Sequence, residues 1–353
     1  MNIARLRLHN QRIAGTTFET PGEVVRWLGA VQAQDYLGAL WAVGLRMRCA
    51  TEGAVERALA ERTILRTWPM RGTLHFVAAA DARWMLELMT PRVVASQAAR
   101  HQREYGLDAA IYSKSRDVLT RALEGGKQLS RNAMYQALED GHVSAAGQHG
   151  IHILWRLAQE GLICFGAREG KQKTFVLLDE WVPGAKRLER EEALAELVRR
   201  YFTGHGPATV QDLMWWSGLT AADVAAGLEM AKADLVQEVV DDRIYWFSSE
   251  QFDSSIPAAY LLPAFDEYVV AYKDRGAVLD SSHVKQTYTV NGIFNPIMIL
   301  DGQVVGTWKR TLKKASVIVT LNPFNPLKKS QERAFARAGA RYGEFLGLPV
   351  VME

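Results

Sequence analysis

One local pattern, helices followed by a two-stranded hairpin, recurs three times along the chain and constrains its fold more than any other feature. Such a recurrence of one supersecondary unit is the strongest signal of how a chain is organised. A helix-turn-helix with a hairpin behind it is the outline of a winged helix. The sequence therefore predicts three tandem winged helices, which agrees with a length of 353 residues, enough for several domains.

The first copy occupies residues 1–110. Thr20-Pro21-Gly22-Glu23 predicts a helix start, with Thr as the N-cap, Pro at the first helical position and Glu at the third. The apolar spacing then continues this helix to Val31. The other expected elements are helices near 37–45 and 51–59, strands at 63–68 and 73–77, and a turn at 69–72.

The second copy covers residues 111–186 and the third covers residues 187–252. In the second, Ser130 is a plausible N-cap and a Gly- and Lys-rich tip, residues 166–171, separates two β-prone runs. The expected elements of the second copy are a helix from 130, a helix at 148–160 and strands at 161–165 and 173–177. Those of the third are helices at 193–201, 209–216 and 221–232 and strands at 235–240 and 243–247.

The remainder, residues 253–353, is rich in β-prone runs. Asp301-Gly302 between two of them is a strong signal of a two-residue hairpin turn. Strands are expected at 288–290, 296–300, 303–308 and 315–321, with a closing helix at 325–346. The predicted fold class is α+β, with three winged helices and a C-terminal β-rich domain.

Charge is unevenly distributed, although the net charge is only +3. Residues 1–110 hold fourteen arginines, no lysine and ten acids, and residues 303–337 hold eight Lys or Arg against Glu332 alone. Two basic regions in a nearly neutral protein favour a localised binding site for a polyanion such as nucleic acid. A solvated helix face is the plainer alternative.

Several classes are excluded or disfavoured by composition. No run approaches 18 apolar residues and the N-terminus lacks an apolar signal region, so we expect neither a membrane span nor secretion. Cys49 and Cys164 are expected to be reduced, buried thiols, which favours a cytoplasmic location. His149 and His152 have helical spacing but no third ligand, so we expect no metal and no cofactor.

The string Val31-Gln32-Ala33-Gln34-Asp35 closes the first predicted helix. Gln32 and Gln34 diverge in a regular helix, but at a frayed or extended end both amides can point into one cleft. An ordinary polar helix terminus is the plainer interpretation.

Across nearly its whole length the chain resembles the winged-helix DNA glycosylases of the AlkZ/YcaQ type, the helix-turn-helix 42 family. The resemblance depends on strings that occur in order along the chain, each weak alone. They are Val31–Asp35, Arg66–His75, Gly204–Thr209 with Trp215–Leu219, Leu262–Tyr268 with Tyr272–Arg275, and Asp301–Arg310. The family's active site is a Gln-apolar-Gln or Gln-apolar-Asp motif, which Gln32-Ala33-Gln34 matches.

The resemblance implies a monofunctional DNA glycosylase that removes alkylated purines, including bulky N7-guanine adducts and crosslinks, without a metal or a lyase step. An N7-alkylated base is cationic and a good leaving group, so the enzyme chiefly needs a positioned water. Carboxamides are neutral and carry both a donor and an acceptor, so Gln32 and Gln34 can orient that water. Asp35 is a candidate base, and His75 a candidate contact to a phosphate or to the lesion.

The resemblance implies double-stranded DNA with alkylated bases as the partner, and hence a place with the bacterial nucleoid. We expect no protein partner, no membrane and a monomeric state. The candidate phosphate contacts are Arg66, Arg71, Lys309, Arg310, Lys313 and Lys314. The tryptophans Trp27, Trp41, Trp84, Trp155 and Trp215 are expected in the core.

Two other functions remain open at this point. A non-enzymatic DNA-binding regulator or adduct sensor fits winged helices, although the third copy offers Asp223 and Glu229 where a base-reading helix needs donors. A purely structural assembly module is the other alternative, for which duplex binding is absent or insensitive to salt.

Overall fold

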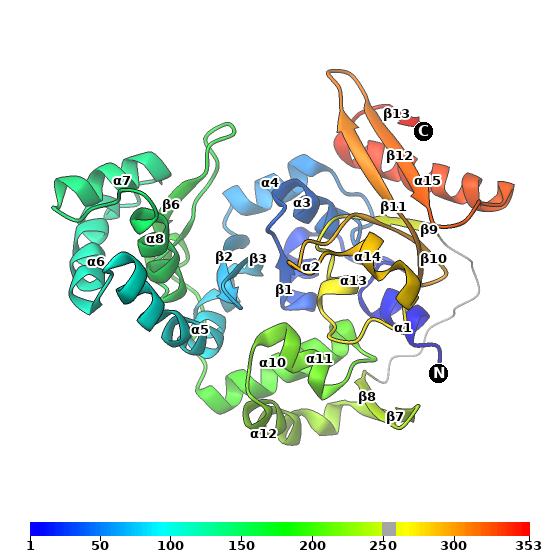
Figure 1. The fold of residues 1–353 in the computed structure, drawn as a ribbon, viewed down its shortest axis with the longest axis horizontal. Coiled ribbons are helices and arrows are strands. Elements are labelled where there is room, and N and C mark those ends of the chain that lie inside the picture. Colours follow the sequence, from blue (N-terminus) through cyan, green and yellow to red (C-terminus); the bar gives the residue numbers. More distant parts are fainter. Residues whose placement is uncertain (249–258) are drawn as a thin grey trace. The chain divides into compact units, whose positions relative to one another are not determined.

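The computed structural model describes residues 1–248 and 259–353 (Figure 1). They form a mixed α+β fold, the class predicted from the sequence. The chain divides into two compact units, one made of residues 1–56 and 194–353 and the other of residues 57–193. Helices α4 (Glu52–Ala60) and α10 (Arg190–His205) contain the two boundaries. The four-part division of the sequence stays a prediction.

The first unit combines a helical part with a β-sheet. Its helices are α1 (Ile3–Asn10), α2 (Pro21–Leu28), α3 (Tyr36–Gly44), α10, α11 (Val210–Ser217), α12 (Ala221–Ala231), α13 (Glu267–Val270), α14 (Val284–Thr287) and α15 (Lys329–Leu346). Strand β1 (Ala30–Gln32) follows α2, and β7 (Val236–Val240) pairs with β8 (Arg243–Phe247) as an antiparallel hairpin.

A five-stranded sheet dominates the C-terminal part of this unit. Its order is β13 (Val350–Met352), β12 (Val317–Pro323), β11 (Gln303–Leu312), β10 (Ile297–Leu300) and β9 (Ala259–Leu262). All neighbours are antiparallel except β12 and β13. The predicted turn at Asp301-Gly302 is confirmed, since both residues have positive φ between β10 and β11. Figure 1 shows α15 beside the long β11–β12 hairpin.

The second unit contains a long helix, a helical group and two sets of strands. Its elements are α4, β2 (Ile64–Met70), β3 (Thr73–Ala78), α5 (Ala82–Tyr105), α6 (Ala109–Leu123), β4 (Leu129–Ser130), α7 (Arg131–Asp140), α8 (His149–Gln159), β5 (Ile163–Phe165), β6 (Thr174–Leu177) and α9 (Leu178–Trp181). Strands β2 and β3 form a hairpin, and β4, β6 and β5 form an antiparallel sheet in that order. Buried side chains such as Leu119, Met134 and Leu154 join α6, α7 and α8 in one core.

Helix starts follow the capping residues that the sequence predicts. Thr20 accepts from the Glu23 N–H while the Glu23 carboxylate accepts from the Thr20 N–H, a complete capping box at α2. Ser130 likewise caps α7, accepting from the Ala133 N–H. Local hydrogen bonds of this kind are readable from sequence because both partners lie within one turn.

Some local predictions were wrong. Residues 288–290 do not form a strand, and Tyr288 makes an isolated bridge to Phe294. Trp215 is 47% exposed, whereas its neighbour Trp216 is buried, because an α-helix turns adjacent side chains to different sides. Cys164 is a buried free thiol, as expected, but Cys49 is exposed. Elements with no predicted counterpart include strands β9 and β13 and helices α1, α6, α9, α13 and α14.

Candidate active site

Gln32 lies at the end of a strand, so the prediction of a helix end at residues 31–35 was wrong. Helix α2 stops at Leu28, and Gly29 adopts a positive φ of 74° that ends the helical path. The chain then runs extended through β1, and both Gln32 and Ala33 are buried. Gln32 is the last residue of the strand and Gln34 lies in a bend before α3, so the alternation of a regular strand does not extend to Gln34.

A buried carboxylate holds the backbone of this strand. The Gln32 N–H donates to Glu267 Oε1 over 2.8 Å, although the two residues are 235 positions apart. The other oxygen, Oε2, accepts from the Trp216 indole N–H at 2.9 Å and lies 3.6 Å from His205 Nε2. Glu267, Trp216 and His205 are all buried. Sequence reasoning quoted these residues within the family strings but gave none of them a role.

Gln34 and Asp35 occupy a more open position. Gln34 is exposed, and Asp35 is half-buried at the N-cap of α3. Asp35 Oδ2 lies 3.4 Å from Arg310 Nη2, and Arg310 also donates to the Tyr342 hydroxyl at 3.2 Å. A Cβ at Gly38 would lie 2.6 Å from Asp35 Oδ2, so a side chain there would displace this carboxylate. The structure therefore joins two candidates that the sequence treated separately.

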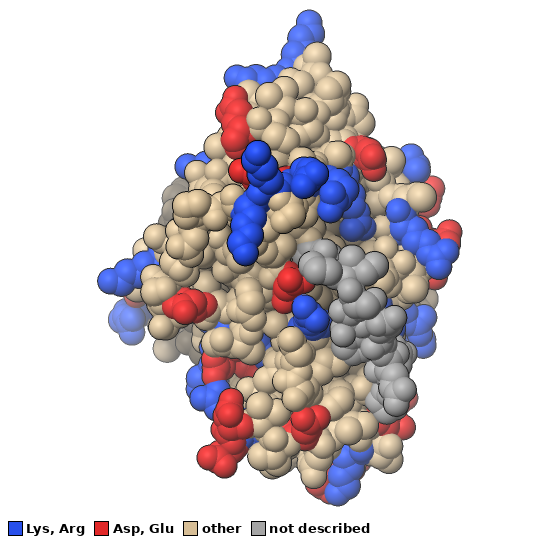
Figure 2. All heavy atoms as spheres, turned by 90° about the vertical axis from the view of Figure 1, so that its right-hand side faces the viewer, with Lys and Arg blue, Asp and Glu red and all other residues tan. Residues whose placement is uncertain are grey.

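The other basic candidates of this unit lie on the β11–β12 hairpin. Lys309, Lys313 and Lys314 are exposed, and the Lys313 N–H donates to Ser316 O where the hairpin turns. Arg310 differs because adjacent strand residues point to opposite faces, which turns it toward Tyr342. In Figure 2 the tip of this hairpin stands at the top, and Lys and Arg side chains gather over the upper half of the face.

Arg66, Arg71 and His75 lie in the second compact unit, on the β2–β3 hairpin. Arg66 is buried, with its guanidinium 5.1 Å from the centroid of the Phe165 ring. Arg71 occupies the hairpin turn with a φ of 51°. His75 is fully buried, and its Nδ1 lies 3.0 Å from Thr73 O. A contact between His75 and a phosphate or a base therefore requires access to a buried ring.

A basic cluster in the second unit was missed by the sequence analysis. Desolvation lowers the pKa of Lys173 on the hairpin of the second copy, and the like charges of Arg66, Arg131 and Arg168 lower it further. These four cations come from three sequence-distant segments. Only the fold brings them near one another, which is why the local charge count gave no sign of them.

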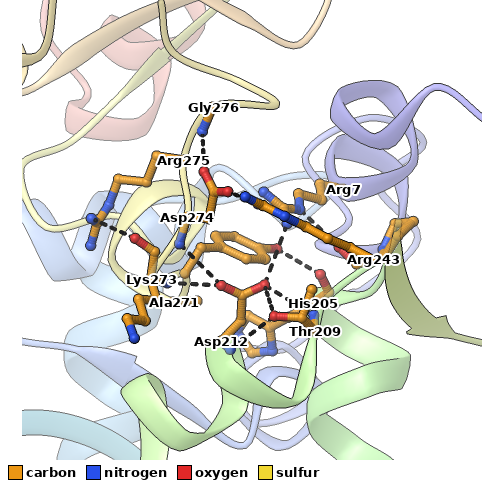
Figure 3. A network of polar contacts seen from close by, with 12 residues as sticks. Arg7, His205, Thr209, Asp212, Arg243, Ala271, Lys273, Asp274, Arg275 and Gly276 are labelled. Carbon is orange, nitrogen blue, oxygen red and sulfur yellow. Dashed lines mark hydrogen bonds and ion pairs between the residues drawn. The ribbon is translucent and has the colours of Figure 1, made fainter. Parts of the chain in front are cut away.

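A polar network centred on Asp212 fixes the elements around α13 (Figure 3). Asp212 Oδ2 accepts from the Thr209 N–H and hydroxyl, both at 3.0 Å, and lies 3.8 Å from Arg7 Nη2. Its Oδ1 accepts from the backbone N–H groups of Lys273 and Asp274 at 2.9 and 3.2 Å. One carboxylate thus ties α1, α11 and the segment after α13 together.

Two further findings concern only the residues that the structure describes. No helix among them combines the length and apolar character needed to cross a membrane. Nor do they contain a group of three or more His, Cys, Asp or Glu side chains placed to hold a metal ion.

Comparison with known proteins identifies the family. The family model described as "DNA glycosylase AlkZ-like" matches residues 25–345. The interstrand DNA cross-link repair glycosylase of Streptomyces sahachiroi is 25% identical over 367 residues, covering 97% of this chain and 95% of that protein. The solved structure of Streptomyces sahachiroi DNA glycosylase AlkZ shares the fold, with a TM-score of 0.83 at 23% identity over 100% of this chain and 98% of that one. The chain belongs to the AlkZ-like DNA glycosylase family and is a DNA glycosylase.

Proposed function

We propose that this glycosylase is monofunctional and hydrolyses the N-glycosidic bond of N7-alkylated purine nucleotides, with a water positioned by Gln32 and Gln34. The observation that carries the proposal is the placement of this Gln-apolar-Gln motif. It begins on a strand whose backbone is anchored by Glu267 and ends at the exposed Gln34. An anchored backbone with a solvent-facing amide suits a group that must hold water in a fixed direction.

The chemistry needs little from the protein beyond orientation. The water oxygen bonds to the sugar C1′ as the C1′–N9 bond breaks, and the electron pair of that bond neutralises the cationic alkylated base. The water proton passes to solvent, leaving an abasic site and a neutral base. Glutamine is a weak base, so unalkylated purines, which leave poorly, are expected to remain intact. The two amides supply one donor group and one acceptor each.

Asp35 and His75 are auxiliary candidates within this proposal. Asp35 directly follows Gln34, but its ion pair with Arg310 gives it a second role in fixing the start of α3. We favour that positioning role over proton abstraction. For His75, full burial favours a role in supporting the β2–β3 hairpin.

DNA contact is proposed to use the exposed lysines Lys309, Lys313 and Lys314 of the β11–β12 hairpin, together with Arg71 in the turn of β2–β3. Arg66 lies on the same β2–β3 hairpin but is buried, so its contact with a phosphate requires its side chain to become accessible. The recurrence of helices followed by β2–β3, β5–β6 and β7–β8 supports three winged helices with a β-rich C-terminal domain. Boundaries at residues 110, 186 and 252 are part of this proposal, and the last of them lies outside the residues that the structure describes.

The lesion is proposed to be bulky or crosslinked. One relative that covers nearly the whole chain is named for interstrand cross-link repair. A monomer without cofactor or protein partner is sufficient for the reaction above.

Release of 7-methylguanine from methylated duplex DNA tests the proposal under single-turnover conditions. We expect Gln32→Ala and Gln34→Ala each to slow release by about 10²-fold, the scale of a misplaced reactant, while DNA affinity is retained. Gln237→Ala, an exposed glutamine on β7, is the matched control and should release at the wild-type rate. Unchanged release by both motif variants would contradict the proposal, as would tight binding by the wild type with no release.

A further inference from the structure

Glu267 is a fully buried acid that the proposed reaction does not use directly. Its two oxygens are shared between two N–H donors from distant parts of the chain, the Gln32 backbone at 2.8 Å and the Trp216 indole at 2.9 Å. A buried carboxylate is costly unless such donors satisfy it. The groups that Glu267 binds should therefore explain why an acid is buried at this position.

The surroundings of Glu267 make it a rigid anchor. Its own carbonyl accepts from Gln11 Nε2 at 3.2 Å, so both its backbone and its side chain are fixed. The preceding residue, Asp266, accepts from Arg46 Nη1 and Nη2 at 2.9 and 2.8 Å and caps α13 by accepting from the Tyr268 N–H. The carboxylate of Glu267 is thus presented from a helix start that is itself held by a buried ion pair.

The strand that receives this anchor is short. Strand β1 has three residues and Gln32 is its last, so the hydrogen bond falls at the point where the chain leaves regular structure. The direction of the Gln32 and Gln34 side chains depends on the backbone at this point. Trp216 also lies close to the residue that precedes the strand, since its Cη2 atom is 3.5 Å from where a Cβ at Gly29 would be.

We infer that Glu267 is a positioning residue for the Gln32-Ala33-Gln34 motif and acts through the Gln32 backbone N–H, an inference that rests on the proposed function. It touches neither water nor DNA in this role. Glu267 lies 235 positions from Gln32 along the chain, and its hydrogen bond to the Gln32 N–H helps to orient the two side-chain amides of the motif. Two of the strings that the family shares, Leu262–Tyr268 and Val31–Asp35, are therefore linked by this hydrogen bond, with one string supplying the acceptor and the other the donor.

Glu267→Gln is the sharpest test, because it keeps the size of the side chain but provides one acceptor oxygen for two N–H donors. One of the two hydrogen bonds must fail. We expect single-turnover release of 7-methylguanine to slow at least tenfold while the dissociation constant for DNA stays within twofold of wild type. Glu267→Ala, which removes both acceptors, should be slower still. Glu191→Gln, an exposed acid in the first turn of α10, is the matched control and should behave as wild type.

Hydrogen–deuterium exchange separates positioning from loss of folding. In Glu267→Gln the peptide that contains Gln32 should exchange faster, while peptides of α15 and β12 keep their protection. Trp216→Phe removes the indole donor but leaves the Glu267 oxygen that accepts from the Gln32 N–H. Its rate of 7-methylguanine release should therefore fall less than that of Glu267→Gln.

The outcomes distinguish the two proposals. If Gln32→Ala and Gln34→Ala abolish release while Glu267→Gln releases at the wild-type rate, the inference is wrong and the proposed function stands. If the glutamine variants are fully active, the proposed function fails first. Faster exchange throughout the protein in Glu267→Gln, together with weaker DNA binding, would show a general structural role and overturn the inference.

Discussion

Strand β1 and the tip of the β11–β12 hairpin belong to the same compact unit but have opposite environments. Gln32 is 8% exposed and its backbone is bound by a buried carboxylate, whereas Lys309, Lys313 and Lys314 are exposed. The first region is suited to fixing geometry, and the second to attracting a polyanion. Because of this difference, we expect mutations in the two regions to affect the rate of base release and the affinity for DNA separately.

The largest expected effect is a loss of stability when a buried ion pair near strand β1 is broken. Asp266→Ala leaves Arg46 buried without its bidentate carboxylate, which should reduce the free energy of unfolding by about 3–5 kcal/mol. Chemical denaturation measures this directly. Glu19→Gln breaks the exposed Arg48–Glu19 pair and should cost less than about 1 kcal/mol. Equal effects of the two variants would remove the contrast between buried and exposed regions.

A smaller effect should distinguish two neighbouring residues of β11, Lys309 and Arg310, by their contributions to DNA binding and to base release. Lys309 is exposed, so Lys309→Ala should weaken DNA binding and reduce the slope of log K against log salt by about 1. Arg310 is paired with Asp35 and Tyr342, so Arg310→Ala should leave that slope unchanged and slow base release instead. Binding isotherms at several salt concentrations, with single-turnover rates, measure both quantities. A reduced salt slope for Arg310→Ala would assign it to phosphate binding.

The smallest expected effect is a change of stability with pH, and it comes from a pair of histidines outside both regions. The His101 and His152 rings lie 4.6 Å apart between α5 and α8, and burial, followed by neighbouring positive charge, lowers the pKa of both from 6.5. As the pH falls below about 6.5, these histidines become protonated in the unfolded chain but stay neutral in the folded protein. The free energy of unfolding therefore decreases as the pH falls toward the lowered pKa values. Tm should be lower at pH 5.5 than at pH 7.5.

A neutral replacement provides the control for this pH effect. His152→Gln should have a shallower fall in Tm between pH 7.5 and pH 5.5 than the wild type, because one of the two groups no longer titrates. An identical pH dependence in the two proteins would locate the sensitivity elsewhere.

Local signals predicted most of the secondary structure. Thr20 and Glu23 cap α2, Ser130 caps α7, and Asp301-Gly302 turns β10 into β11, each through contacts within a few residues. Prediction failed where a partner lies far away. The apolar spacing of residues 24–31 predicts a helix that continues to Val31, but Gly29 ends it and Glu267 holds the extended chain that follows.

The candidate site shows the same division. Gln32, Gln34, Asp35 and Arg310 were all named from the sequence, but the ion pair that joins Asp35 to Arg310 was not, because 275 positions separate them. The roles of Glu267, Trp216 and the cations around Lys173 were missed for the same reason.

The sequence by itself determined the capped starts of α2 and α7, the hairpin turn at Asp301-Gly302, the basic regions and the identity of the two glutamines, because caps, turns and residue type act over short distances along the chain. Only the tertiary structure decided that residues 30–32 form a strand and that Glu267 holds the Gln32 backbone. The physical reason is that a buried carboxylate is stable only where distant N–H groups converge on it, and that convergence exists only in the folded protein.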